Sequence, residues 1–109
     1  MSTANELVWK ALSNATRRQM LDLLRDGGRS TGEIAGEFPE LSRYAVMQHL
    51  GVLEEAGLLL VRREGRRRLN YLNPVPIERI YQQWMHPFAS RMAKEMLALE
   101  QHLESQTEE

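Results

Sequence analysis

Residues 41–72 read LSRYAVMQHLGVLEEAGLLLVRREGRRRLNYL, and this stretch decides the fold. Its first half carries the signals of a helix, because Ser42 is a good N-cap and Gly57 is a good stop. The apolar residues between them recur at helical spacing and are Val46, Leu50 and Leu53. We therefore expect an amphipathic helix with one buried face and one face free for a partner.

The second half of this stretch predicts a β-hairpin. Residues 58–62 and 67–72 have the composition of strands, and Glu64-Gly65 between them is a hairpin turn signal. Basic residues crowd around this turn against a single acid, and they are Arg62, Arg63, Arg66, Arg67 and Arg68. Such crowding costs mutual repulsion, which an anionic partner would relieve. The alternative is that Arg62 or Arg68 folds back on the domain.

Upstream of this stretch, capping signals and apolar spacing predict three more helices. The first covers about residues 5–12, and the second covers about residues 15–25 with Asn14 as its N-cap. Ser30 and Glu33 match the capping box of a short third helix. The third and fourth helices, joined by a tight turn, form a helix-turn-helix.

Downstream, residues 73–104 predict a C-terminal helix with a bend at Pro87, followed by a frayed tail over residues 105–109. The apolar stripe of this helix is longer than the rest of the chain can cover. Ordinary packing within the chain stays open, but a second copy is the simplest cover, with Trp9 joining from the first helix. The residues expected at this dimer interface are Trp9, Ile80, Trp84, Phe88, Met92, Met96, Leu99 and Leu103.

The composition is that of one intracellular domain. The 109 residues, 42% of them hydrophobic, suffice for a modest core, so we expect a single domain over residues 1–109. No cysteine is present, which excludes disulfides, Cys-ligated zinc and thiol chemistry. The sequence has no signal peptide and no long apolar run, so we expect a cytoplasmic protein with no membrane contact.

Catalytic and metal-binding motifs are missing from the sequence. It has no HExxH, no paired cysteines and no Gly-rich phosphate loop. His86, Glu100 and His102 are scattered along the last helix, and they would hold a metal only across a dimer. We therefore expect no enzymatic activity, no cofactor and no metal site, while an inter-subunit site stays open.

The free face of the fourth helix is the candidate for reading double-stranded DNA. Recognition helices touch base edges mainly through exposed residues of their N-terminal turns. The residues of that kind here are Ser42, Arg43, Tyr44, Met47, Gln48 and His49. Arg43 suits guanine and Gln48 suits adenine. A solvated helix face is the alternative for the set. His49 could donate to a phosphate, and a structural histidine is the alternative for this residue.

Residues 6–85 resemble the ArsR/SmtB-type (arsenic-repressor-like) winged helix-turn-helix transcriptional regulators. The similar segments are ALSNATRRQMLDLL, TGEIAGEF, residues 41–72 and NPVPIERIYQQW. The resemblance implies a mainly α fold with a small β-hairpin, in the order α-α-α-α-β-β-α, dimeric through its terminal helices. It also implies a repressor that binds a pseudo-palindromic operator through residues 42–49 and through a wing over residues 62–68.

The chain departs from the metal-sensing members of that family. Those members use a Cys pair near the third helix, where this chain reads RSTGEIA. The resemblance is therefore to the cysteine-free, metal-independent branch, and the signal that would release DNA stays unknown. Two other functions stay open: a winged-helix module that binds proteins, and a sensor with a metal or small-molecule site at the C-terminal helix.

Overall fold

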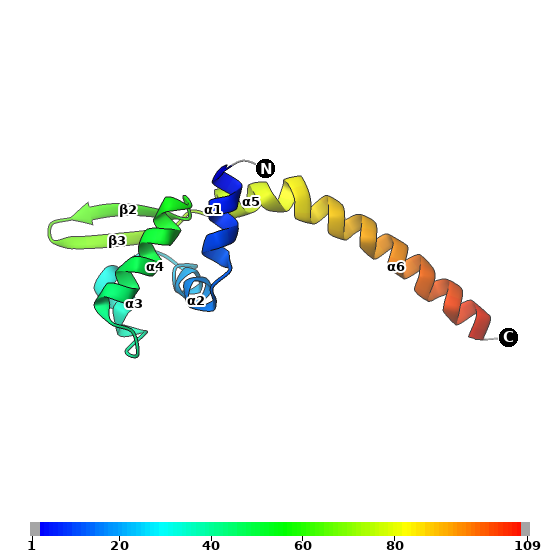
Figure 1. Ribbon diagram of the computed structural model, residues 1–109, viewed down its shortest axis with the longest axis horizontal. Helices are drawn as coiled ribbons and strands as arrows, with labels where there is room; N and C mark the ends of the chain where they lie inside the picture. The colour runs from blue at the N-terminus through cyan, green and yellow to red at the C-terminus, as the bar shows by residue number, and fades with distance from the viewer. Residues whose placement is uncertain (1–2, 108–109) are drawn as a thin grey trace. The chain divides into compact units, whose positions relative to one another are not determined.

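The computed structural model describes residues 3–107, and the chain divides into two compact units, Met1–Ile77 and Glu78–Glu109. Figure 1 shows their elements in chain order. The helices are α1 (Thr3–Leu12), α2 (Ala15–Leu23), α3 (Thr31–Gly36), α4 (Arg43–Glu55), α5 (Val75–Ile80) and α6 (His86–Thr107). The strands are β1 (Arg29–Ser30), β2 (Leu59–Glu64) and β3 (Arg67–Leu72). The sequence analysis predicts a single domain whose C-terminal part starts at residue 73, whereas the second compact unit starts at Glu78.

The core of the first unit is built around α4, which is in contact with α1, α2, α3 and β2. Its predicted apolar face is fully buried, since Val46, Leu50 and Leu53 are each 0% exposed. The side chains from the other elements that complete this core are Val8, Ala11, Met20, Leu21, Leu24, Ile34, Phe38, Leu58 and Leu59. Burial on one face fixes α4 and leaves its other face outside the core.

The helix starts follow the predicted caps. The side chain of Asn14 accepts a hydrogen bond from Arg17 N at 3.1 Å, and Ser42 Oγ accepts one from Ala45 N at 3.1 Å. Ser30 and Glu33 form the predicted capping box at the start of α3. The predicted end of α2 is too late, because a tighter turn already replaces the helix at Leu24, whose N–H bonds Leu21 O at 3.0 Å.

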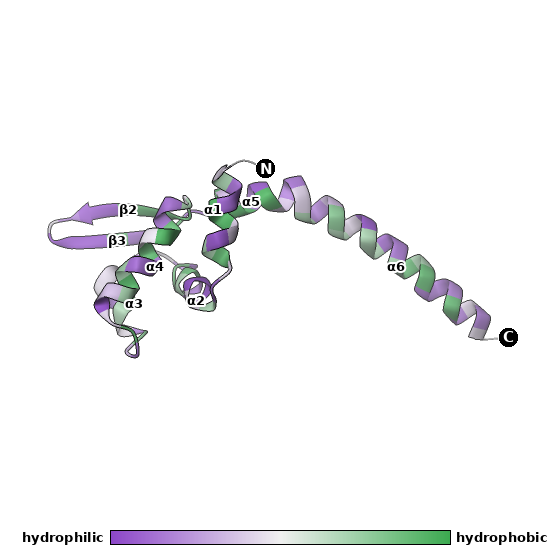
Figure 2. Cartoon of the chain, viewed as in Figure 1, coloured by the Kyte–Doolittle hydropathy of each residue, from purple (hydrophilic) through white to green (hydrophobic). Residues whose placement is uncertain are grey.

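The sheet has three strands rather than the predicted two. The order is β1-β3-β2, with both pairings antiparallel. Arg29 and Ser30 form β1 opposite Asn70 and Leu69 of β3. A strand of two residues shows no alternation, so the sequence pattern gives no sign of it. The outer parts of β2 and β3 are hydrophilic in Figure 2.

The C-terminal unit contains a π-helical turn that the sequence does not predict. Tyr81–Met85 form this turn between α5 and α6, and His86 N–H donates to Tyr81 O across it. Pro87 has no N–H to give to an α-helical bond, so a wider turn next to it replaces the simple bend expected there.

The end of the chain also differs from the prediction. Helix α6 extends to Thr107, where the threonine hydroxyl donates to Leu103 O at 2.8 Å, so residues 105–107 are helical rather than frayed. Residues 108–109 lie outside the described part. Among residues 3–107, no helix is both long enough and apolar enough to cross a bilayer.

Candidate nucleic-acid interface

The exposed face of α4 carries most of the residues predicted to read DNA. Arg43, Tyr44, Met47 and Gln48 are all exposed, and Tyr44 reaches 73% exposure. Gln48 Nε2 donates to Tyr44 Oη at 2.7 Å, so these two side chains lie together on this face. Arg43 forms no ion pair with any residue of the described range 3–107. The face therefore offers a free guanidinium, an amide and a phenol.

Ser42 has a structural role at the start of α4. Its hydroxyl oxygen accepts the Ala45 N–H, which is one of the backbone donors left unpaired at a helix N-terminus. The hydroxyl hydrogen stays free to donate. Any contact of Ser42 with a partner would therefore be made from the capped position.

His49 is half-buried, and it joins α4 to α2. Its Nδ1 lies 3.3 Å from Nη1 of Arg17. Arg17 also donates from Nε to Ala11 O at 2.8 Å and from Nη2 to Lys10 O at 2.9 Å. Burial and then the nearby Arg17 charge lower the pKa of His49 below its usual 6.5. This geometry favours the structural alternative for His49 over a contact with a phosphate.

The arginines of the wing (β2, β3 and the turn between them) fall into two groups. Arg67 pairs with Glu33 at 3.0 Å, Arg68 pairs with Glu54, and Arg62 lies 3.9 Å from Glu64. Arg68 is the most buried of these, with 19% of its side chain exposed. Arg63 and Arg66 are exposed and form no ion pair within the described residues.

The five arginines are therefore not equivalent. The alternative that Arg68 folds back on the domain is confirmed, whereas Arg62 pairs only within the wing. The sequence does not reveal the pairing of Arg67, because Glu33 is 34 positions away and nothing local connects the two residues. Arg63 and Arg66 remain, with no acid partner among residues 3–107, as cations at the tip.

Glu33 is the most engaged carboxylate near the wing. Hydrogen bonds from the Ser30 backbone and side chain, and then the Arg67 charge, lower the pKa of Glu33 below its usual 4.5. The lowered pKa favours the charged carboxylate of Glu33, which supports the ion pair between α3 and β3 at neutral pH.

The residues predicted for a dimer interface are exposed in the single chain, apart from two. Ile80 is 3% exposed, so it is buried in its own chain and is not available to a partner. Trp9 is half-buried. Trp84 and Phe88 are 56% and 55% exposed, with stacked rings whose centroids lie 5.3 Å apart. The other exposed members are Met92, Met96, Leu99 and Leu103.

The residues considered for a metal site are not gathered in one chain. Across residues 3–107, no cluster of at least three His, Cys, Asp or Glu side chains is placed to hold a metal ion. His102 contacts Gln106 at 3.1 Å, and the His86 ring lies 5.5 Å from the Tyr81 ring.

A helix-turn-helix followed by a basic wing defines the winged helix-turn-helix class of proteins. Comparisons with known proteins agree with this assignment. Residues 12–62 match the family described as a helix-turn-helix domain. The HTH-type transcriptional regulator Rv2034 of Mycobacterium tuberculosis is 44% identical over 66 residues, which span 61% of this chain and 61% of that protein. The aligned part is thus less than two thirds of that relative.

Longer alignments identify the family. The arsenic resistance transcriptional regulator ArsR1 of Pseudomonas putida is 33% identical over 99 residues, covering 81% of this chain and 77% of that protein. The crystal structure of a possible transcriptional regulator for arsenical resistance superposes with a TM-score of 0.64 at 31% identity, covering 79% of this chain and 92% of the other. The chain belongs to the ArsR/SmtB-type winged helix-turn-helix regulators. Both of these relatives are named as transcriptional regulators.

Proposed function

We propose that this chain binds double-stranded DNA as a transcriptional regulator, with α4 in the major groove and the wing on the flanking phosphates. The observation that supports the proposal is that two exposed surfaces suited to DNA belong to one compact unit. One is the exposed face of α4, and the other is the wing tip with Arg63 and Arg66 unpaired among the described residues. A major groove about 12 Å wide admits a helix, and cations beside it neutralise phosphates.

The two surfaces have different tasks in this proposal. Arg43 suits the paired acceptors of guanine, and Gln48 suits adenine once it exchanges its bond to Tyr44 for bonds to the base. Met47 and Tyr44 supply apolar contact for a thymine methyl group. The wing arginines grip the backbone and do not choose among sequences.

The decisive experiment is to find which genomic fragments the purified chain retains, and then to measure its affinity for them by fluorescence anisotropy. We expect salt-sensitive binding that prefers one sequence. Arg43→Ala and Gln48→Ala should change the preferred sequence, because a bidentate base contact supplies about 1–3 kcal/mol of discrimination. Equal affinity for every duplex would contradict specificity, and no retention at low salt would contradict DNA binding.

We also propose that the chain acts as a homodimer through the exposed stripe of α6. The stripe is Phe88, Met92, Met96, Leu99 and Leu103, each at least 43% exposed. The charges beside it are unevenly distributed: the first half carries Arg91 and Lys94, with Glu95 paired to Arg91 at 3.7 Å, and the second half carries Glu100 and Glu104. In an antiparallel pair of α6 helices, the basic half of one helix lies against the acidic half of the other. In a parallel pair, halves of like charge lie against each other.

Light scattering after size-exclusion chromatography tests this dimer. Glu100→Lys with Glu104→Lys should shift the chain toward monomer, and adding Arg91→Glu with Lys94→Glu should restore the dimer. A monomer at all concentrations would contradict the proposal. A dimer presents two α4 helices, which suits a pseudo-palindromic site with half-sites about 34 Å apart.

The remaining parts of the proposal concern regulation. We propose that the chain acts in the cytoplasm and represses transcription by occupying the promoter. The absence of cysteine from the sequence favours regulation without a thiolate-bound metal. A promoter–reporter assay with and without the chain gives the direction, and higher expression with the chain would contradict repression.

A further inference from the structure

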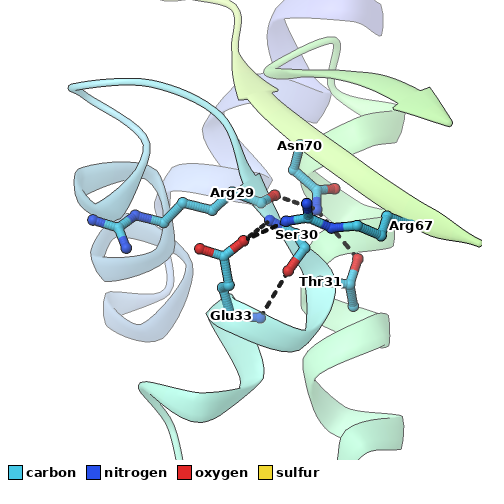
Figure 3. Close-up of polar contacts among 6 residues, drawn as sticks. All are labelled: Arg29, Ser30, Thr31, Glu33, Arg67 and Asn70. Carbon is cyan, nitrogen blue, oxygen red and sulfur yellow. Dashed lines mark hydrogen bonds and ion pairs between the residues drawn. The ribbon is translucent and has the colours of Figure 1, made fainter. Parts of the chain in front are cut away.

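Strand β3 is fastened to both helices of the helix-turn-helix. Arg67 reaches Glu33 of α3 at 3.0 Å, and Arg68 reaches Glu54 of α4. Deeper in the sheet, Asn70 is 0% exposed and donates from Nδ2 to Thr31 Oγ1 at 3.2 Å. Figure 3 shows the Arg67–Glu33 and Asn70–Thr31 contacts side by side at the start of α3.

Strand β2 and the turn are not fastened in this way. Beyond Val61 the residues of β2 are all exposed, and within the described part of the chain Arg62 pairs only with Glu64 of the same strand. Arg63 and Arg66 have no acid partner among residues 3–107. The wing therefore has one strand that anchors it, β3, and a second part, β2 with the turn, in which Arg63 and Arg66 have no acid partner among the described residues.

Anchoring matters because the outer wing has almost no core of its own. Leu69 is its last buried apolar residue toward the tip, and an isolated two-stranded hairpin is at best marginally stable in water. A wing that moves freely has to be ordered when its arginines meet phosphates, and that ordering weakens binding.

We propose that Glu33 and Glu54 are positioning residues that hold the wing in register with α4 before any DNA is bound. Each carboxylate anchors one arginine of β3, so that Arg63 and Arg66 are presented at a fixed distance from the exposed face of α4. This inference rests on the proposed DNA-binding function, since the register matters only if both surfaces meet one duplex.

The proposal predicts a change in DNA affinity whose direction is opposite to the one that charge alone predicts. Removing an acid near the wing makes the surface more positive, so charge alone would tighten binding to DNA. If Glu33 and Glu54 position the wing, their removal weakens binding in spite of the gain in positive charge.

The test uses two glutamine substitutions with matched controls. Glu33→Gln keeps the cap of α3, because a glutamine oxygen can accept the Ser30 N–H in place of the carboxylate. The double variant Glu33→Gln/Glu54→Gln is compared with Glu37→Gln/Glu55→Gln. Glu37 and Glu55 are exposed neighbours at the ends of the same two helices, and neither forms an ion pair within the described residues.

The first readout is amide hydrogen exchange of the free protein. The amides of residues 61–69 should exchange faster than in the wild type in the positioning double variant, and at the wild-type rate in the control. The amides of α4 should stay protected in both variants. Equal protection of the wing in the two variants would overturn the proposal. This readout needs no DNA, so it judges the fastening even if the regulator proposal fails.

The second readout is affinity for the duplex that the wild-type chain retains from its genome, and for an unrelated duplex of the same length. Partly exposed ion pairs contribute modestly, so the positioning double variant should bind the retained duplex about three- to tenfold more weakly. The control should bind both duplexes as tightly as wild type or more tightly. Tighter binding by both variants would overturn the proposal, whereas wild type binding no duplex would overturn the regulator function itself.

Discussion

Nη1 of Arg17 lies 3.3 Å from Nδ1 of His49, and this contact joins α2 to α4. Only a neutral imidazole can accept a bond at Nδ1. The contact therefore depends on pH.

The free energy of unfolding should fall as the solution is acidified. The pKa of His49 is lower in the folded chain than its usual 6.5, so the unfolded chain takes up the proton first. The stabilisation is complete above the unfolded pKa and is lost as pH falls through the folded one. Urea unfolding from about pH 7.5 to about pH 5 should show this loss. His49→Gln should flatten the part of the profile due to this residue, and an unchanged profile would contradict the assignment.

Arg17 should contribute more to stability than its neighbour Arg18. The side chain of Arg17 is half-buried and bonds Lys10 O, Ala11 O and His49, whereas the exposed side chain of Arg18 bonds Leu12 O alone among the described residues. Arg17→Ala should cost about 2–3 kcal/mol, because it leaves several acceptors unpaired. Arg18→Ala should cost less than about 1 kcal/mol. Thermal or urea unfolding measures both, and equal losses would contradict the role of Arg17.

Gly51 in α4 should accept alanine with a gain in stability. A Cβ at this exposed helical position would meet no atom within 4 Å. Gly51→Ala should therefore stabilise the chain by about 0.5–1 kcal/mol. The control is Gly57→Ala, which should destabilise it because Gly57 has φ 78° at the end of α4. A loss of stability in both variants would contradict this prediction, because position 51 would then not tolerate the added methyl group.

The free wing arginines should determine the salt dependence of DNA binding. Arg63→Gln with Arg66→Gln should lower the slope of log affinity against log salt by about 1.8, because each phosphate that is no longer neutralised removes about 0.9. Arg25→Gln on α2 is the control, since Arg25 pairs with Asp22 at 3.2 Å and lies outside the wing. An unchanged slope in the wing variant would contradict its binding to phosphates.

The parts of the fold that the sequence predicted are those with local signals. Ser42 and the Ser30–Glu33 box bond backbone groups three residues away, so a short pattern identifies them. The buried face of α4 is likewise predicted by the helical spacing of its apolar residues. These features need no knowledge of the rest of the chain.

The features that the sequence does not predict depend on residues far apart. Arg67 and Glu33 are 34 positions apart, and Asn70 and Thr31 are 39 positions apart. Nothing near Arg67 distinguishes it from the unpaired Arg66, because the difference is which side of the hairpin faces α3. The candidate site can thus be predicted as a set of residues, while the division of labour within it requires the fold.

The order of the sheet has one more consequence. Strand β1 covers one side of β3, which leaves β2 as an edge strand whose outer backbone groups have no neighbour in the sheet. Such edges invite pairing with another chain, and bulky charged side chains discourage it. Arg62 and Arg63 lie on that edge, so we expect their charge to discourage aggregation of the chain. Any variant that removes their charge needs a solubility measurement before its weaker DNA binding is interpreted.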